Sequence, residues 1–191
     1  MRDDELCYMP ATEALARFRD KSLSPVELMA AVIARAEQTE PKLNAITYRH
    51  FDEAMDSARK AEARYAKGGR TRALEGLPVA IKDESYIKGK PTSNGSLILK
   101  DHVADHTSPV NERILRAGAI VHARTATPEF SCAGYCWSRL WGVTRNPWNT
   151  DFTPGGSSGG SGAVLAAGST TLATGSDIGG SIRIPASLTG T

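Results

Sequence analysis

Glycine is concentrated in one short stretch of the sequence, and this stretch limits the folds that the chain can adopt. Nine of the 18 glycines lie between Gly155 and Gly180. Glycine loses more conformational freedom on folding than any other residue, so this concentration costs backbone entropy. We therefore expect that sharp turns or close backbone approaches require glycine at these positions.

Composition and charge exclude several classes of protein. With 191 residues, 40% of them hydrophobic, the chain is long enough for one domain with a hydrophobic core. A net charge of +2, with the basic residues scattered, argues against contact with nucleic acid. Three cysteines, an odd number, favour a reducing compartment over a disulfide framework. The sequence has no signal-peptide pattern and no run of ~20 apolar residues, which predicts a cytoplasmic protein without membrane contact.

Helical and strand patterns alternate along the chain. Helical spacing or helix-start signals predict helices over 12–19, from Ser24-Pro25 to about Glu40, and over 51–66, 108–117 and 158–168. Pro41 is predicted to end the second of these helices. Short apolar runs predict strands over 43–48, 77–81, 119–121 and 171–174. This alternation predicts an α/β fold with a largely parallel or mixed sheet.

Lys82 directly follows the apolar run Leu77–Ile81, which has the composition of a buried strand. A lysine in this place either extends its amine into water or is held in a partly desolvated site. Desolvation lowers the pKa of a lysine and makes it a usable base near neutral pH. From its position alone, a surface lysine at a strand end is the simpler interpretation.

Two motifs lie in the glycine-rich stretch. The run 154–162 leads into a predicted helix, but it has neither the Gly-Lys-Ser/Thr of a Walker A loop nor the glycine spacing of a dinucleotide fingerprint. A flexible linker is a further interpretation of this run. In the second motif, 175–186, successive glycines precede Ser181. They free the backbone to direct N–H groups at one point, which suits an oxyanion hole beside a serine nucleophile.

Taken together, these motifs resemble the amidase signature family. The resemblance lies in Gly-Gly-Ser-Ser-Gly-Gly at 155–160 and Asp-x-Gly-Gly-Ser-x-Arg-x-Pro at 177–185. The serines Ser157 and Ser181 are 24 residues apart, which is the spacing of the family. Segments 76–83, 128–130 and 144–148, and the opening segments 24–28 and 41–45, are also similar to family sequences. The resemblance covers nearly the whole chain.

The resemblance implies a fold and its division. The expected fold is α/β, with a mixed twisted sheet between helix layers, and it is incomplete in this chain. Residues 1–70 are expected to form a helical segment that packs on the core. Residues 71–191 are expected to form the N-terminal part of the amidase signature domain, with its C-terminal half absent. Family members are more than twice as long, so we expect the chain to be a fragment of a longer enzyme.

The resemblance also implies a Ser-Ser-Lys triad. Ser181 is the expected nucleophile, Ser157 the proton relay and Lys82 the base. The remaining implied site residues are the oxyanion-hole N–H groups of Ile178, Gly179, Gly180 and Ser181, and the supporting residues Ser158, Ser176 and Asp177. The family holds the first serine on a cis peptide, here Gly156–Ser157, and Arg183 is expected to be structural, paired with a carboxylate. No metal or cofactor is implied.

Other residues that could carry chemistry lack a recognisable setting. The histidines, His50, His102, His106 and His122, are expected at the surface, and Cys132 and Cys136 are expected to be buried or idle thiols. The three tryptophans are expected in the core or in a pocket wall. Glu84 departs from the family pattern, which often has an uncharged residue here. A carboxylate close to Lys82 raises its pKa and weakens the resting base, unless the Glu84 side chain points away.

Three functions stay open from the sequence. The first is an amidase that hydrolyses a small linear carboxamide through an acyl-enzyme. The second is the glutamine-hydrolysing subunit of a tRNA-dependent amidotransferase. The third, from another class, is a non-catalytic module whose glycine-rich loop binds an anion. The expected partner is a small-molecule amide substrate, and a homodimer is left open.

Overall fold

The computed structural model describes residues 3–191, which form a mixed sheet with helices on both sides. The helices are α1 (Asp3–Cys7), α2 (Ala11–Asp20), α3 (Pro25–Leu43), α4 (Phe51–Lys67), α5 (Pro109–Arg116), α6 (Gly159–Ala166) and α7 (Arg183–Thr189). Two short 3-10 turns lie at η1 (Leu97–Leu99) and η2 (Glu129–Ser131). The strands are β1 (Ile46–Arg49), β2 (Pro78–Lys82), β3 (Ile120–Thr125), β4 (Trp137–Ser138), β5 (Gly142–Val143) and β6 (Leu172–Ala173).

The main sheet has the strand order β1-β3-β2-β6. Strand β2 runs parallel to both of its neighbours, β3 and β6, whereas β1 is antiparallel to β3. All five residues of β2 are buried, as expected for a central strand covered on both faces. Strands β4 and β5 form a separate two-stranded hairpin. The predicted α/β class with a mixed sheet is confirmed.

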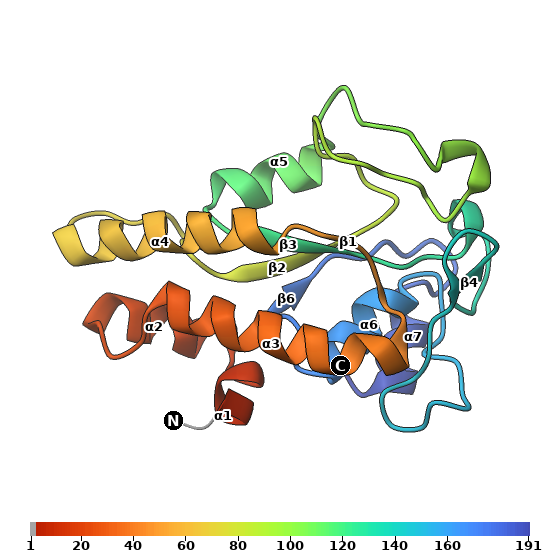
Figure 1. Cartoon of the computed structure of the whole chain (residues 1–191), viewed down its shortest axis with the longest axis horizontal. Coiled ribbons are helices and arrows are strands. Elements are labelled where there is room, and N and C mark those ends of the chain that lie inside the picture. The colour runs from red at the N-terminus through yellow and green to blue at the C-terminus, as the bar shows by residue number, and fades with distance from the viewer. Residues whose placement is uncertain (1–2) are drawn as a thin grey trace.

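The alternation of side chains along β2 determines where its last residue points. Ala80 packs in a cluster with residues of α3 and α6, including Ala36 and Val164. Val79 and Ile81 face the other side, where they contact residues of α5. In Figure 1, α3 and α6 lie below the sheet and α5 lies above it. Because side chains alternate with a period of two, Lys82 lies on the same face as Ala80, toward α6.

The prediction that Pro41 ends its helix was wrong. Helix α3 starts with a capping box between Ser24 and Glu27 and continues to Leu43. Proline in the last turn removes only its own N–H from the ladder, so the helix can run two residues further. Asn44, whose φ is +50°, is the C-cap that follows the helix. The sequence patterns also missed α1 and α7, and β6 is a short half-buried strand, not the longer buried one that was expected.

The surface position predicted for the histidines was wrong for His122. This residue lies on β3 with its side chain fully buried, and its Nε2 is 3.0 Å from Thr170 Oγ1. Burial lowers the pKa of His122 to about 3, so the ring is neutral at pH 7. Trp148 is 75% exposed and lines a surface cavity with Leu43 and Pro147, which agrees with the expectation that the tryptophans lie in the core or in a pocket wall.

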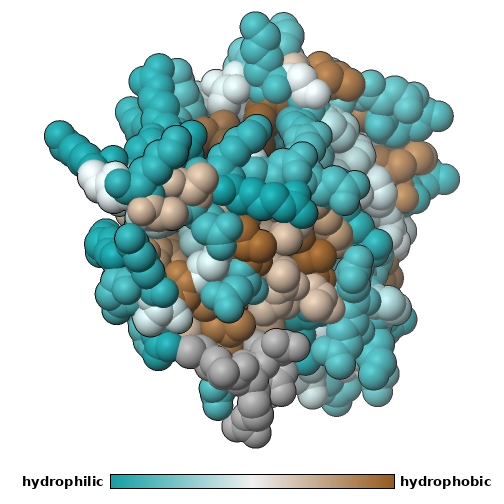
Figure 2. All heavy atoms as spheres, turned by 60° about the vertical axis from the view of Figure 1, so that its left-hand side comes forward, coloured by the Kyte–Doolittle hydropathy of each residue, from teal (hydrophilic) through white to brown (hydrophobic). Residues whose placement is uncertain are grey.

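The face seen when the left side of Figure 1 is turned forward is largely hydrophilic, with hydrophobic groups visible between charged side chains (Figure 2). Among residues 3–191, no helix combines the length and the apolar composition needed to cross a bilayer. Cys7 and Cys136 are buried free thiols, and Cys132 is an exposed free thiol.

Candidate active site

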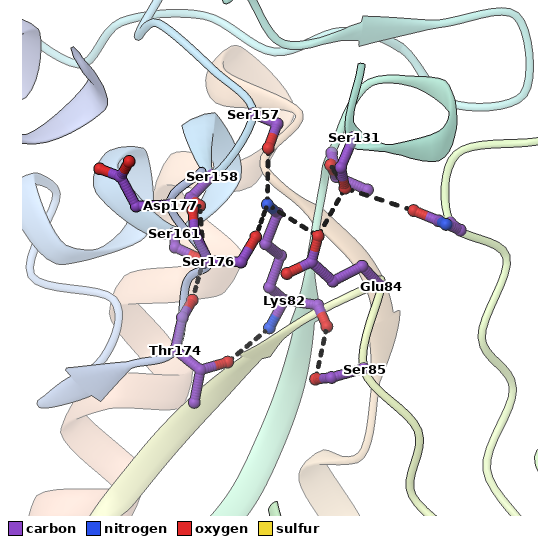
Figure 3. A network of polar contacts seen from close by, with 12 residues as sticks. Lys82, Glu84, Ser85, Ser131, Ser157, Ser158, Ser161, Thr174, Ser176 and Asp177 are labelled. Carbon is purple, nitrogen blue, oxygen red and sulfur yellow. Dashed lines mark hydrogen bonds and ion pairs between the residues drawn. The ribbon is translucent and has the colours of Figure 1, made fainter. Parts of the chain in front are cut away.

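Lys82 is a buried lysine at the carboxyl end of a central strand. Its side chain is 1% exposed, and its backbone N–H donates to Thr174 Oγ1, which follows the neighbouring strand β6. The side chain extends from β2 toward Ser157, just before α6, and Ser176, just after β6 (Figure 3). The alternative interpretation from sequence, a surface lysine at a strand end, is therefore wrong. Burial excludes bulk water from the amine, and the sheet fixes its position.

Ser157 lies just before α6, in the first glycine-rich motif. The Gly156–Ser157 peptide bond is cis, in agreement with what the resemblance implied. A Cβ added to Gly156 would lie 2.7 Å from Ala133 O, and one added to Gly160 would collide with the backbone of Ala126. Glycine is thus required because other segments approach this backbone closely. The result is that Ser157 Oγ lies 2.7 Å from Lys82 Nζ.

Ser176 and Ser158 belong to the same polar cluster. Lys82 Nζ donates to Ser176 Oγ at 2.9 Å, so Ser176 contacts the lysine directly. Ser158 Oγ is 3.4 Å from both the N–H and the carbonyl oxygen of Ser176. Ser158 therefore fixes the backbone that carries Ser176, and it has no hydrogen bond to Lys82 within residues 3–191.

Asp177 organises the second glycine-rich motif. Its carboxylate accepts the N–H of Gly180 at 2.7 Å and the guanidinium of Arg183 at 2.9 and 3.0 Å. These contacts, with the Arg183 side chain first, hold the pKa of Asp177 well below its usual range. Arg183 was expected to be structural and paired with a carboxylate, and it is paired with Asp177. Asp177 shapes the loop and, among the described residues, does not contact Lys82 or Ser157.

Ser181 lines the same open cavity as Ser157 and Ser176. The cavity measures about 570 Å³, and Glu84 is its charged lining residue. Ser158 N–H donates to the Ser181 carbonyl at 3.1 Å, which ties the two motifs together. Between residues 3 and 191, no direct hydrogen bond joins the hydroxyls of Ser157 and Ser181, so the last link of the triad remains a prediction.

The predicted oxyanion hole is a turn at the mouth of this cavity. Ile178 and Gly179 line the cavity with Ser181. The N–H of Gly180 donates to Asp177, whereas within residues 3–191 those of Ile178, Gly179 and Ser181 have no protein acceptor. The role of these four N–H groups remains a prediction.

Opposing influences act on the pKa of Lys82. Burial lowers it, and the carboxylate of Glu84, whose Oε2 lies 3.0 Å from Nζ, raises it; burial prevails. For Glu84, burial favours the neutral acid, but the hydroxyls of Ser131 and Ser176 and the charge of Lys82 together lower its pKa. Glu84 is therefore ionised at neutral pH. Of the two orientations left open by the sequence, its side chain takes the one toward Lys82.

The sequence model of the Amidase family matches residues 27–191. This chain belongs to the amidase signature family. That membership agrees with the resemblance found in the sequence motifs. It explains why the strand that ends at Lys82 and the motifs of Ser157 and Ser181 have the spacing found in the family.

Curated relatives within the amidase signature family include two kinds of enzyme. The chain is 42% identical over 180 residues to an indoleacetamide hydrolase of Bradyrhizobium diazoefficiens, covering 94% of this chain and 34% of that protein. It is 41% identical over 186 residues to a glutamyl-tRNA(Gln) amidotransferase subunit of an Anaeromyxobacter species, covering 97% of this chain and 38% of the relative. The chain thus spans little more than a third of the length of these relatives.

Solved structures show the same family fold. A bacterial aryl acylamidase of the amidase signature family superposes with a TM-score of 0.88 at 36% identity, covering 94% of this chain and 37% of the other. Fatty acid amide hydrolase superposes with a TM-score of 0.92 at 29% identity, covering 96% and 32%. The mixed sheet and helix layers of this chain are therefore those of an amidase signature enzyme.

Two features of the site were missed by sequence reasoning. Ser131 Oγ donates to Glu84 Oε2 at 2.6 Å, although the two residues are far apart in sequence. On the other side of β2, Asp83 lies 3.5 Å from Arg124, and neither side chain is exposed. Three consecutive charged residues, 82–84, at the end of a buried strand carried a signal for polar clusters on both faces, but the partners come from other segments and had no local pattern.

Proposed function

We propose that this protein hydrolyses a linear carboxamide through an acyl-enzyme on Ser181. The observation that best supports the proposal is the 2.7 Å contact between the buried amine of Lys82 and Ser157 Oγ, beside a cavity that Ser181 lines. A serine hydroxyl is a poor nucleophile at its own pKa and needs a positioned base. A buried lysine with a lowered pKa is such a base.

In the proposed reaction, protons move along the three side chains. Ser181 Oγ bonds to the carbonyl carbon of the amide, its proton passes to Ser157 Oγ, and the Ser157 proton passes to Lys82 Nζ. The N–H groups of Ile178, Gly179 and Ser181, which have no acceptor within residues 3–191, stabilise the oxyanion. Each such donor contributes ~3–4 kcal/mol in comparable sites. The ammonium of Lys82 then returns a proton through Ser157 to the leaving nitrogen, the C–N bond breaks, and water hydrolyses the ester on Ser181.

The test is substitution of the serines in the full-length protein. Ser181→Ala should abolish amide hydrolysis and labelling by a fluorophosphonate probe. Ser157→Ala should reduce kcat/KM by ~10²-fold or more, because a positioned acid–base group contributes ~10²–10⁴-fold. Ser187→Ala changes an exposed serine of α7 and is the matched control. Wild-type labelling of Ser181→Ala would contradict the proposal. A wild-type protein that the probe does not label would instead support an anion-binding module without catalysis.

A second candidate is the release of ammonia from glutamine within a tRNA-dependent amidotransferase. The 41% identity to a glutamyl-tRNA(Gln) amidotransferase subunit favours it. Ammonia release from glutamine should then depend on added partner proteins, whereas a free-standing amidase should release ammonia or an amine from simple carboxamides alone.

The three free thiols, which suit a reducing compartment, support our placement of the protein in the cytoplasm.

A further inference from the structure

The amine of Lys82 has three polar partners, which is the number that a tetrahedral nitrogen can accommodate. Nζ lies 2.7 Å from Ser157 Oγ, 2.9 Å from Ser176 Oγ and 3.0 Å from Glu84 Oε2 (Figure 3). A neutral amine has two N–H donors and one lone pair. A carboxylate can only accept hydrogen bonds, so the contact with Glu84 must use an N–H. If the second N–H is donated to Ser176, the lone pair faces Ser157.

Glu84 is itself held in place by a second set of contacts. Ser131 Oγ donates to Glu84 Oε2 at 2.6 Å, and Ser131 Oγ also lies 2.9 Å from Thr127 Oγ1. Ser131 and Phe130 have φ values of +56° and +50°, so the turn η2 holds two consecutive residues in the left-handed region. Residues other than glycine adopt this conformation only when their surroundings impose it. The orientation of the Glu84 carboxylate is therefore built into the fold.

We propose that Glu84 is a positioning residue of the amide-hydrolysing reaction, which directs the lone pair of Lys82 toward Ser157 and stabilises the ammonium that Lys82 becomes. This inference rests on the proposed function of Lys82 as the base. Ser157 gives a proton to Nζ in the step that forms the bond from Ser181 to the carbonyl carbon. The new positive charge then lies 3.0 Å from a carboxylate that was already in place. Pre-arranged charge of this kind needs no reorganisation during the reaction.

The charged groups around the amine determine the expected pH dependence. Glu84 and the thiol of Cys136 act on Lys82, and burial raises the pKa of Cys136, so that the thiol is neutral. Asp83 and Arg124 face the other side of β2 and pair with each other. Glu84 is thus the charge that keeps Lys82 protonated to a higher pH. Its removal should yield a neutral amine at lower pH, but an amine that is a weaker and less well-oriented base.

The experiment is the pH dependence of fluorophosphonate labelling in the full-length protein. In this reaction Ser181 Oγ bonds to phosphorus, fluoride leaves and the serine proton passes through Ser157 to Lys82, so no amide substrate needs to be known. The labelling rate constant should rise with pH through the pKa of Lys82. Glu84→Gln should move this rise to lower pH by about one unit or more, the effect typical of a neighbouring opposite charge. The plateau at high pH should fall ~3–10-fold.

Two variants separate charge from structural disturbance. Glu84→Asp keeps the charge, so its pH midpoint should lie closer to wild type than that of Glu84→Gln. Ser131→Ala removes the hydroxyl that holds the carboxylate without removing its charge, so its midpoint should move by less than that of Glu84→Gln. If Glu84→Gln fails to fold, Ser131→Ala is the test, because it frees the carboxylate and should lower the plateau at high pH. A plateau of wild-type height in Ser131→Ala would then overturn the inference. A midpoint that Glu84→Gln leaves at the wild-type pH, or that Glu84→Asp shifts as far as Glu84→Gln, would overturn the inference.

The outcome for Ser181→Ala distinguishes this inference from the function on which it rests. If Ser181→Ala is not labelled and Glu84→Gln leaves the midpoint unchanged, the triad stands and only the role of Glu84 is rejected. If Ser181→Ala is labelled like wild type, the proposed function itself is rejected.

Discussion

Lys82 and Asp83 are neighbours at the end of β2, but they belong to two different polar clusters. Lys82 faces α6 and an open cavity, and its partners are hydroxyls and the partly exposed Glu84. Asp83 faces the interior, where it accepts from Ser93 Oγ at 2.5 Å and lies 3.5 Å from Arg124. One strand end therefore carries both an accessible cluster and a closed one, because consecutive side chains point to opposite faces.

The difference lies in the kind of partner that each cluster contains. Serine hydroxyls can both donate and accept, so the Lys82 cluster can pass a proton along its hydrogen bonds. In the Asp83 cluster, Arg124 donates to the carbonyl oxygens of Lys82 and Ser85 at 3.3 and 2.5 Å. These contacts fix the loop after β2. The one hydroxyl on Asp83, that of Ser93, accepts from Trp141 Nε1, and neither Ser93 nor Trp141 lines the cavity, so this cluster offers no route for a proton to the cavity. The first cluster should therefore control activity and the second should control stability.

The strongest test of this division is Lys82→Met. Methionine keeps most of the side-chain volume and removes the amine, so kcat/KM should fall by ~10²-fold or more. The free energy of unfolding should fall by less than in Arg124→Met, because methionine keeps the volume of the aliphatic stem and the Glu84 carboxylate left without the amine is 20% exposed beside the cavity. Amide hydrolysis and urea unfolding measure the two effects. Lys88→Met, at an exposed lysine of the same segment, is the control. Wild-type turnover by Lys82→Met would remove the distinction.

The second test is Arg124→Met, which removes one member of the buried pair. Leaving Asp83 buried without its partner should destabilise the fold by ~3–5 kcal/mol, while activity per folded molecule falls much less than in Lys82→Met. The double variant Asp83→Leu/Arg124→Met should recover most of the loss, because apolar residues of similar volume often replace a buried ion pair without cost. A double variant no more stable than Arg124→Met would contradict this account of the pair.

The pH dependence of the Arg124→Met effect follows from the pKa of Asp83. Burial, opposed by Ser93 and Arg124, raises this pKa from 3.8 to about 6 in the folded protein. A raised acid pKa means that the folded state binds the proton more tightly, so the contribution of Asp83 to stability is present below pH 3.8 and is lost as the pH rises through 6. Without Arg124 the pKa should rise further. The destabilisation by Arg124→Met should therefore be smaller at about pH 5 than at about pH 8 in urea unfolding.

The sequence predicted the parts of the fold and site that have local patterns. The strand ending at Lys82 follows from five apolar residues, and the serine motifs have a family spacing that survives in this chain. The alternation of side chains makes Lys82 and Asp83 face opposite ways once β2 is recognised. Pro41 shows the limit of such rules, because the end of α3 is determined by Asn44 and by the Glu40 carboxylate, which accepts from the N–H of Ala45 and Ile46.

The remaining features depend on contacts between distant segments. His122 is buried because β3 is central in the sheet, and its neighbour in the hydrogen-bond network, Thr170, is 48 residues away. Likewise, the side-chain orientation of Glu84 depends on Ser131, 47 residues along the chain. No periodicity or local motif encodes such pairs, so the sequence could identify Glu84 as a departure from the family pattern but could not decide between its two orientations.

The smallest expected effects come from removing one hydroxyl from each cluster. Ser176→Ala removes one of the three partners of Lys82 Nζ. It should reduce kcat/KM by ~3–10-fold, since one hydrogen bond of a charged or basic group is worth ~1 kcal/mol, with little change in stability. Ser93→Ala removes the hydroxyl that donates to Asp83 and should cost ~1.5–3 kcal/mol of stability with little change in activity per folded molecule. If both variants changed activity and stability to the same extent, the two clusters would be one network, and their separation across β2 would have no functional meaning.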